Sequence, residues 1–339
     1  MVMGQIGKIF TILSINNLTP KKTNYIFLDE VQYIENFERL LVGLQTKDNV
    51  DLYITGSNAY MLSSEMATLL SGRSVEISML PLSFREYLEI FDDENKTRDE
   101  KFNNFLSYGG FPQAVKTFNA EPDSIDLYLT SIYDTVVGRD ILGRENITTR
   151  ATLDLVMKYL LDNIGNSTSI NNIAEHLDLS RYKVEQIIDS LKASFLFYQL
   201  NRLDLKGKDL LKTQEKYYAV DLGLRWSILG RNSQTDRGHI LENVVYLELL
   251  RRGAKISVGK IGNKEIDFVA RSIDGNTSYY QVAWSVRDPK TLERELEPLR
   301  KVQDFNHRFL ITLDPEEPTY EGIRQLNVIN WLLKNDKAQ

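Results

Sequence analysis

The sequence predicts a multidomain α/β protein, and patterns in three parts of the chain lead to this prediction. A strand, a helix and a second strand follow one another in residues 24–58. Two helices with a short turn between them, and then a hairpin pattern, occupy residues 167–221. Alternating strands lie between two amphipathic helices in residues 239–304. The 339 residues are enough for roughly two or three domains, each with its own core.

The first strand, NYIFLDEVQYIE at residues 24–35, ends in two acids. Its apolar run from Tyr25 to Leu28 is followed by Asp29 and Glu30, so the carboxyl end of a buried strand delivers two carboxylates. P-loop nucleotidases use such a strand end, where one acid holds Mg²⁺, usually through water, and the other polarises the attacking water. Phosphate chemistry is therefore the first expectation for this pair.

Residues 37–58 extend the pattern into a parallel sheet. Apolar residues from Phe37 to Leu44 have the spacing of one helical face, and an apolar strand at 52–55 follows. Strand, helix and strand in succession predict a parallel pair whose carboxyl ends meet at one edge. Ser57 and Asn58 are therefore expected beside the two acids, where a sensor of the γ-phosphate would lie.

The other half of a nucleotide site is missing from the sequence. No segment fits G-x-x-x-x-G-K-[ST], the loop whose backbone N–H groups and lysine hold the phosphates. The nearest pattern, GQIGKI at 4–9, has Ile9 where the hydroxyl residue belongs and leaves no room for a helix and a strand before Asp29. It is expected to be a strand or an amphipathic segment instead of a phosphate loop.

Helices dominate the middle of the chain. A helix ending at Arg73 and a short strand with Val75 and Ile77 precede Pro81, which introduces another helix. The helices then continue to residue 165 and are interrupted by a tight turn, YGGFPQ at 108–113.

A winged helix-turn-helix is predicted next. One helix has its apolar face from Ile170 to Leu177, a turn follows at Ser180, and a longer helix has its apolar face from Val184 to Leu191. The hairpin from FLFYQLNR to KYYAVDLG would form the wing.

Two roles are open for the winged helix: DNA contact, or protein contact as a lid. Residues 150–235 hold twelve Lys or Arg against ten Asp or Glu, a net charge of +2, which is mild for a DNA reader. The charged residues on the second helix are Arg181, Lys183, Lys192, Glu185 and Asp189. Its acids would oppose a phosphate backbone.

A small α/β domain is predicted for the end of the chain. An amphipathic helix ends at Gly253, and the strands AKISVGKIG, KEIDFVAR and YYQVAW follow. A charged helix at 290–304, the strand RFLITL and a final helix from residue 321 complete it. The tyrosine pairs at 217–218 and 279–280 lie in strand-like runs, so they are expected in the core and not as base-stacking platforms.

Composition excludes several classes of protein. The formal charge of −6 argues against a generally cationic nucleic-acid binder, and the absence of cysteine excludes disulfides and thiolate metal sites. Three scattered histidines argue against a histidine metal centre or a Ser-His-Asp triad. No signal peptide and no apolar run long enough to span a bilayer are found, so a cytoplasmic location and no membrane partner are expected.

Several motifs together resemble those of predicted AAA-type ATPases of bacteria and archaea that carry a C-terminal domain of unknown function, DUF 4143. In chain order these motifs are YIFLDEVQ, LYITGSNAYMLSSEMATLLSGR, LPLSFREYL, YGGFPQAV, KYYAVDLGLR, LENVVYLELLRRG, EIDFVA and YYQVAWSV. The similarity runs from about residue 24 to the C-terminus.

The resemblance implies four segments. Residues 1–90 would be a partial P-loop domain of the AAA or RecA type, with Walker B and sensor 1 but no Walker A. Residues 91–150 would be a helical lid, 151–235 the winged helix-turn-helix, and 236–339 the DUF 4143 domain, similar to the PD-(D/E)XK nuclease fold. Family members have a phosphate loop before the acidic strand, so the chain is expected to be N-terminally shortened.

The resemblance also implies roles for individual residues. Asp29 would bind Mg²⁺, Glu30 would activate water, and Arg73 would sense or stabilise the phosphate, in its own subunit or in a neighbour. Ser57 or Asn58 would sense the γ-phosphate. ATP and Mg²⁺ are the implied cofactors, although the missing loop argues against their binding in this chain.

A nuclease site is the other chemistry that the resemblance implies. PD-(D/E)XK enzymes use two acids and then [E/Q]-x-K, and Glu242, Asp267 and Gln281 fall in that order. The lysine position holds Ala283, so cleavage would need a lysine from elsewhere, with Lys264 or Lys260 nearest in sequence. Otherwise the domain is degenerate, and Asp267 would cap the strand end or pair with one of the arginines at 251 and 252.

The resulting hypothesis is an AAA-type ATPase-family protein, regulatory in role, that is unable to bind or hydrolyse ATP unaided. Its partners would be DNA, through the winged helix, and a second copy or another protein that completes the sheet. The alternatives are a non-catalytic DNA- or protein-binding module and a Mg²⁺-dependent nuclease. A phosphate loop, a continuous basic face and a lysine near the acid pair are the respective distinguishing features.

Overall fold

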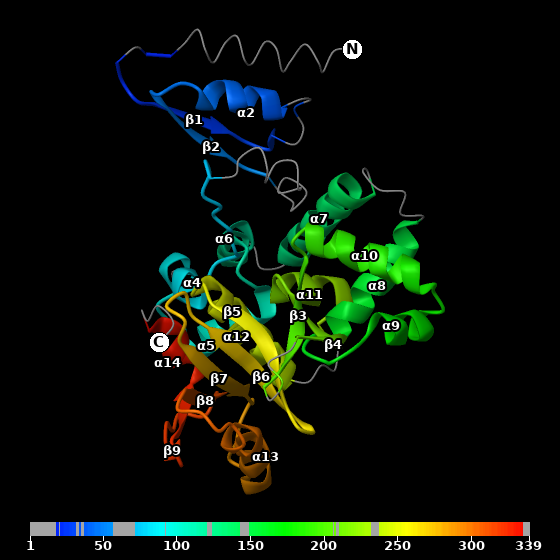
Figure 1. Ribbon diagram of the computed structural model, residues 1–339, viewed down its shortest axis with the longest axis vertical. Helices are drawn as coiled ribbons and strands as arrows, with labels where there is room; N and C mark the ends of the chain where they lie inside the picture. Colours follow the sequence, from blue (N-terminus) through cyan, green and yellow to red (C-terminus); the bar gives the residue numbers. More distant parts are fainter. Residues whose placement is uncertain are drawn as a thin grey trace. The chain divides into compact units, whose positions relative to one another are not determined.

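The chain forms two compact units in the computed structural model (Figure 1). One comprises Met1–Ser78 with Ala193–Phe195, and the other Met79–Lys192 with Leu196–Gln339. The structure describes residues 18–19, 21–31, 34, 37–56, 72–91, 93–120, 124–142, 149–205, 207, 210–231 and 237–334.

The first unit contains the predicted strand, helix and strand. Strands β1 (Asn24–Leu28) and β2 (Val50–Ile54) are parallel, and helix α2 (Phe37–Gln45) joins them. Side chains that alternate along each strand pack against the buried leucines of α2, because successive strand residues point to opposite faces. The other face of the strand pair carries exposed Tyr25, Phe27 and Tyr53. This βαβ unit confirms the prediction from the apolar runs.

The short strand expected at Val75 and Ile77 is not formed. Residues 74–80 have neither helical nor strand structure, and both side chains are exposed. A strand needs a hydrogen-bonded neighbour, and within the described residues the sheet of this unit has β1 and β2 alone. The helix expected to end at Arg73 falls mostly outside the described residues, as does the GQIGKI segment.

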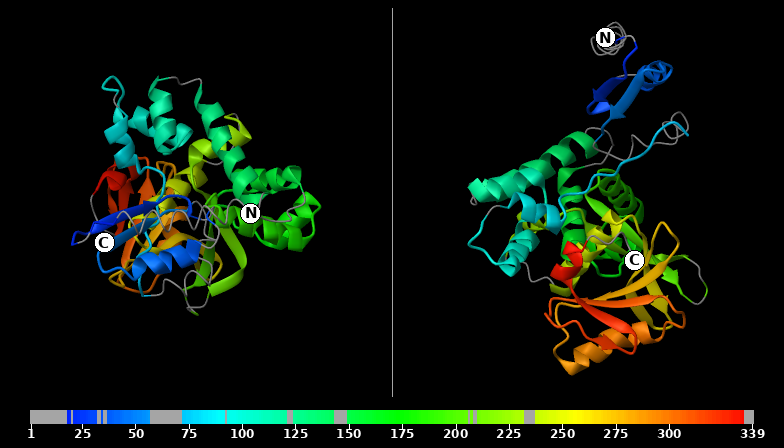
Figure 2. Two further views of the ribbon diagram at one scale, coloured as in Figure 1. Left: turned by 90° about the horizontal axis from the view of Figure 1, so that it is seen from above. Right: turned by 90° about the vertical axis from the view of Figure 1, so that its left-hand side faces the viewer.

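The second unit is built on an eight-stranded sheet with the order β4-β3-β5-β6-β7-β8-β10-β9. Its strands are β3 (Phe197–Asp204), β4 (Leu210–Ala219), β5 (Lys255–Ile261), β6 (Lys264–Arg271), β7 (Thr277–Val282), β8 (His307–Thr312), β9 (Thr319–Tyr320) and β10 (Ile323–Asn327). The antiparallel strands β5, β6 and β7 are followed by α13 (Pro289–Arg300), which crosses over to β8, parallel to β7. This part of the sheet is shown in orange and yellow in Figures 1 and 2.

The remaining helices of this unit follow the predicted order. They are α4 (Phe84–Ile90), α5 (Arg98–Tyr108), α6 (Pro112–Ala120), α7 (Ile125–Val136), the π-helix η4 (Val137–Ile141), α8 (Arg150–Asp162), α9 (Ile170–Leu177), α10 (Arg181–Ala193), α11 (Leu222–Leu229), α12 (Arg237–Arg251) and α14 (Val328–Leu333). A capping box between Ser83 and Glu86 starts α4, and Pro112 starts α6 after the predicted turn. In the described part of the chain, no helix has the length and apolar character needed to cross a membrane.

The two-helix pattern and the hairpin are present, but the hairpin belongs to the large sheet. Helices α9 and α10 are joined by a short turn, and β3 pairs antiparallel with β4. The other edge of β3 pairs in parallel with β5, where Arg202 lies opposite Val258. The expected boundary at residue 235 therefore separates strands of one sheet, and the segments expected to be lid, winged helix and C-terminal domain share one compact unit.

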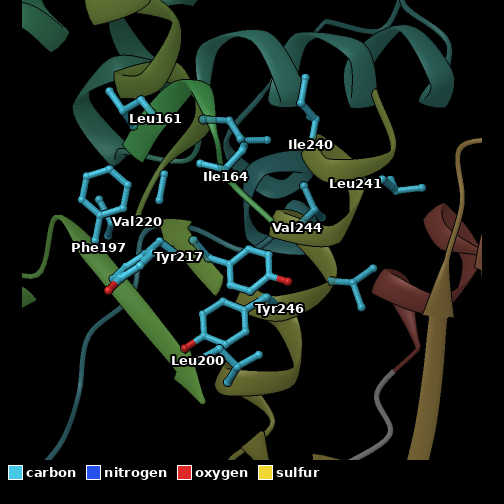
Figure 3. Close-up of a cluster of buried hydrophobic side chains, with 14 of the residues drawn as sticks. Leu161, Ile164, Phe197, Leu200, Tyr217, Val220, Ile240, Leu241, Val244 and Tyr246 are labelled. Atoms are coloured by element: carbon cyan, nitrogen blue, oxygen red, sulfur yellow. The ribbon is translucent and has the colours of Figure 1, made fainter. Parts of the chain in front are cut away.

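A single large core explains why these segments fold together. Its buried side chains run from Phe84 near the start of the unit to Leu332 near its end. Figure 3 shows its middle, where Phe197 and Tyr217 from the hairpin lie among side chains of α12 such as Val244 and Tyr246. The tyrosines at 217–218 and 279–280 are buried, as predicted.

One predicted element is wrong at the end of the chain. The final helix was expected from residue 321, but β10 occupies Ile323–Asn327 and the helix α14 starts at Val328. Ile323, Gln325 and Asn327 are all buried along this strand, which pairs in parallel with β8. Ile323 pairs with Arg308 of β8, which lies 15 positions earlier in the chain. This pairing stabilises a strand here instead of a helix.

Candidate functional site

The acid pair at the end of β1 lies beside a hydroxyl group from β2. The Thr55 hydroxyl donates a hydrogen bond to the Asp29 carboxylate, and the Glu30 N–H donates one to Thr55 Oγ1 at 3.0 Å. Leu28 pairs with Ile54 in the parallel register, so the next residues, Asp29 and Thr55, are neighbours across the strand ends. Asp29 and Thr55 are both exposed.

Glu30 has an unusual backbone. Its φ angle is 51°, in the left-handed region, which costs a residue with a Cβ roughly 1–2 kcal/mol. Backbone strain of this kind gathers at functional sites, where the surrounding structure holds it in place. The left-handed backbone of Glu30 is therefore a second indication of a functional site, beside the polar contact at Asp29.

The structure describes only one of the other three residues predicted for the nucleotide site. Ser57 and Asn58 lie outside the described residues. Arg73 is exposed in a turn that follows Gly72. Thr55 was missed as a site residue, although the pairing of two parallel strands that end together was a signal that could have found it.

The metal side of a nucleotide site fits these residues. A carboxylate and a hydroxyl oxygen are hard ligands of the type that Mg²⁺ prefers. Within the ranges that the structure describes, no three His, Asp or Glu side chains come together as a metal-binding group. The sequence supplies no glycine-rich loop for the phosphates.

A second candidate site is a buried ionic cluster in the second unit. The ammonium of Lys216 on β4 lies 3.2 Å from Glu242 Oε2 on α12 and 3.3 Å from Asp267 Oδ1 on β6. Glu265 Oε1 is 2.9 Å from the same ammonium, and the Tyr218 hydroxyl donates to Glu242 at 3.1 Å. Lys216, Glu242 and Asp267 are only 3%, 5% and 6% exposed.

Two local features bring this cluster together. The pairing of β6 with β7 ends at Phe268 and Tyr280, so the strands part at Asp267, whose carboxylate accepts the Val282 N–H at 2.9 Å. The Asn243 side chain accepts the Ala219 N–H at 2.8 Å and donates to the Ala219 carbonyl at 2.9 Å. This pair of bonds fixes α12 against the end of β4, one residue from Glu242.

Burial and neighbouring charge set the protonation of the cluster. Burial, and then the negative charge of Asp267, raise the pKa of Glu242 to about 8. Burial also raises the pKa of Asp267, against the opposing effects of Lys216 and the Val282 N–H. The carboxylates hold the pKa of Lys216 well above its ordinary value although burial lowers it. Burial therefore favours a proton on the carboxylates of this cluster, while the carboxylates favour the charged form of Lys216.

A lysine from elsewhere does lie near the two predicted acids. It is Lys216, the first residue of the KYYAVDLGLR motif, to which no role was assigned from the sequence. Lys264, one of the two lysines nearest in sequence, pairs with Glu297 at 2.7 Å. The Gln281 amide donates to Glu295 at 2.9 Å, and Gln281 Oε1 is buried without a hydrogen-bond partner in the described structure. The arginines at 251 and 252 pair with Glu248 and not with Asp267.

Comparison with known families gives two matches. The AAA domain family matches residues 6–88, in agreement with the resemblance of the acidic strand. A family described as a domain of unknown function, DUF8612, matches residues 99–235. This is a different domain of unknown function from the expected DUF 4143, and it lies before residue 236.

Three relatives cover most of the chain. An uncharacterized protein of Haemophilus influenzae is 37% identical over 318 residues, which are 91% of this chain and 78% of that protein. Two uncharacterized proteins of Methanocaldococcus jannaschii are 28% and 23% identical, over 84% and 68% of this chain and 66% and 55% of their own length. This chain therefore belongs to the same family as the uncharacterized Haemophilus influenzae protein, and its residues 6–88 match an AAA domain.

Proposed function

We propose that this protein is a nucleotide-linked regulator in which the ends of β1 and β2 form the metal side of a nucleotide site. The contact between Asp29 and Thr55 carries this proposal, because it places two hard oxygen ligands at the edge of a parallel sheet. Asp29 and Thr55 would hold Mg²⁺ directly or through water, and Glu30 would accept a proton from the water that attacks the γ-phosphate. The metal would neutralise charge on the phosphate oxygens.

The phosphate side of the site lacks its usual ligands. The sequence contains no glycine-rich loop, so the phosphates would lack the row of backbone N–H groups and the lysine that usually hold them. We therefore infer that the chain alone binds Mg²⁺·ATP with a dissociation constant on the order of 1 mM, about −4 kcal/mol. Turnover would require a phosphate-binding segment that residues 1–339 do not contain.

Binding of Mn²⁺·ATP, followed by electron paramagnetic resonance at millimolar concentrations, tests the metal side. Asp29→Asn is expected to remove the binding, since an amide is a poorer metal ligand than a carboxylate. Asp51→Asn is the matched control, because Asp51 is an exposed aspartate of β2 in the same unit whose side chain contacts Tyr53. Binding that survives Asp29→Asn, or its complete absence from the unchanged protein, would contradict the proposal.

DNA contact by the second unit is a second candidate function. The N-terminal end of α10 presents exposed Arg181 and Tyr182, and a helix in this position of a helix-turn-helix can enter a major groove. The exposed acids Glu185 and Asp189 on the same helix predict weak binding. Fluorescence anisotropy with duplex DNA at two salt concentrations tests this, and Arg181→Ala should weaken the binding while Arg271→Ala, on β6, should not.

A further inference from the structure

We propose that Lys216 is a built-in cation that fills the metal position between Glu242 and Asp267, so that the second unit contains a latent divalent-cation site closed by its own lysine. This inference concerns the second unit and does not depend on the proposed nucleotide site.

The geometry places the ammonium where a metal would bridge the two acids. Its nitrogen lies 3.2 Å from Glu242 and 3.3 Å from Asp267, while a third oxygen, from Glu265, is 2.9 Å away. Glu242 lies on α12, while Glu265 and Asp267 both lie on β6, so oxygens from two elements surround this one cation at ammonium distances. As the described side chains stand, they form no metal-binding group, in line with the ammonium's place between them. Mg²⁺ would need these oxygens at about 2.0–2.1 Å, so both cations cannot occupy this space together.

Charge balance gives a second argument. A buried carboxylate is costly unless a cation or a proton accompanies it. The Lys216 ammonium is that cation for the Glu242 and Asp267 carboxylates, both of which it contacts. A divalent ion could take its place if the lysine were removed.

Burial argues that the site is closed in this protein. Lys216, Glu242 and Asp267 are almost fully buried, Glu265 is half-buried, and the Asn243 bonds to Ala219 hold α12 against β4 beside them. The Glu242 and Asp267 carboxylates are therefore shielded from a phosphodiester of DNA.

The test is to replace Lys216 and to measure whether the variant gains a Mn²⁺ site. Lys216→Met keeps the length of the side chain and removes its charge, so Mn²⁺ should bind the variant at least about tenfold more tightly than the unchanged protein. The thermal transition of the variant should rise when Mn²⁺ is added. Adding Asp267→Asn to the variant should abolish both effects.

Two further variants serve as a control and as a substitute for the methionine variant. Lys264→Met is the matched control, since Lys264 also pairs with a carboxylate but is 33% exposed, and its removal should create no Mn²⁺ site. Lys216→Gln retains hydrogen-bond donors and serves if the methionine variant does not fold. A folded Lys216 variant with no gain in Mn²⁺ affinity would overturn the proposal.

Mn²⁺ binding and DNA cleavage by the unchanged protein test the proposal independently. We expect no Mn²⁺ binding that depends on Asp267, and no cleavage of DNA that Asp267→Asn removes. If the unchanged protein binds Mn²⁺ through Asp267, or cleaves DNA with Mn²⁺ in an Asp267-dependent way, then Lys216 does not close the site and the proposal is wrong.

Discussion

Asp221 joins two segments of the second unit that lie far apart in the sequence. It is the N-cap of α11, where it accepts the Leu224 N–H at 2.9 Å, and it also accepts the Gly110 N–H of the YGGFPQ turn at 2.6 Å. Burial raises the pKa of Asp221 to about 6, even though these backbone N–H groups lower it. The folded protein therefore binds this proton more tightly than the unfolded chain does.

This difference predicts a pH dependence of stability. Below about pH 4, Asp221 is protonated in both the folded and the unfolded protein, and its contribution to the free energy of unfolding is fully present. Between about pH 4 and pH 6 Asp221 loses its proton in the unfolded chain only, so the free energy of unfolding falls by about 3 kcal/mol in total. Asp221→Asn cannot ionise and should lack this loss. Urea unfolding of both proteins between pH 4 and pH 7, followed by tryptophan fluorescence, checks this, and parallel curves would contradict it.

The candidate sites show how far single residues can be predicted from sequence. The run from Tyr25 to Glu30 gave the strand and both acids, because local patterning decides where a strand ends. Asp267 and Glu242 were marked by motif order. Lys216 was not, because it lies 51 residues before Asp267 on another strand, and only the pairing of β3 with β5 brings β4 into the same sheet.

At the scale of elements, α5 and α11 meet more closely than side chains allow. A Cβ atom on Gly223 would lie 2.1 Å from the Tyr108 carbonyl oxygen and 2.9 Å from the Gly109 nitrogen. Both are backbone atoms, at the end of α5, and cannot turn away. The glycine is therefore required by the approach of the two helices.

Gly223→Ala should separate α11 from the end of α5. The added methyl group forces a backbone shift, for which overpacking costs about 1–3 kcal/mol, and the Asp221 bond to Gly110 should weaken with it. Gly138→Ala is the control, since a Cβ on Gly138 of η4 would meet nothing within 4 Å. Differential scanning calorimetry should show a lowered transition for the first variant only, and an equal effect of both would argue against the close approach.

Element predictions succeeded or failed according to the range of the contacts involved. Helices α4, α5, α8 and α9 begin at their own side-chain caps, so their order could be predicted from local sequence. The strand expected at Val75 and Ile77 has no partner strand in the described structure, and β10 exists because it pairs with β8. Strand formation depends on a neighbour that local sequence does not reveal.

At the scale of the whole molecule, the segments expected to be lid, winged helix and C-terminal domain share one compact unit, and one large cluster of buried side chains draws on all of them. The expected boundary at residue 235 rested on a hairpin that looked like a separate wing. In the structure β3 continues the sheet into β5, and buried side chains from α4 to α14 belong to one cluster. Domains with separate cores can unfold separately, whereas a shared core predicts one cooperative transition.

The three tryptophans of the chain are placed to test this cooperativity. Trp226 lies on α11, in the segment expected to be a winged helix, while Trp284 and Trp331 lie in the segment expected to be a separate C-terminal domain. Protein labelled with 5-fluorotryptophan should give three ¹⁹F resonances, assigned by single Trp→Phe variants. In one urea series, all three folded signals should disappear at the same midpoint, because each ring packs on the same core. Loss of the Trp226 signal at a clearly lower urea concentration than the other two would instead restore the boundary at residue 235, and with it an independent DNA- or protein-binding module.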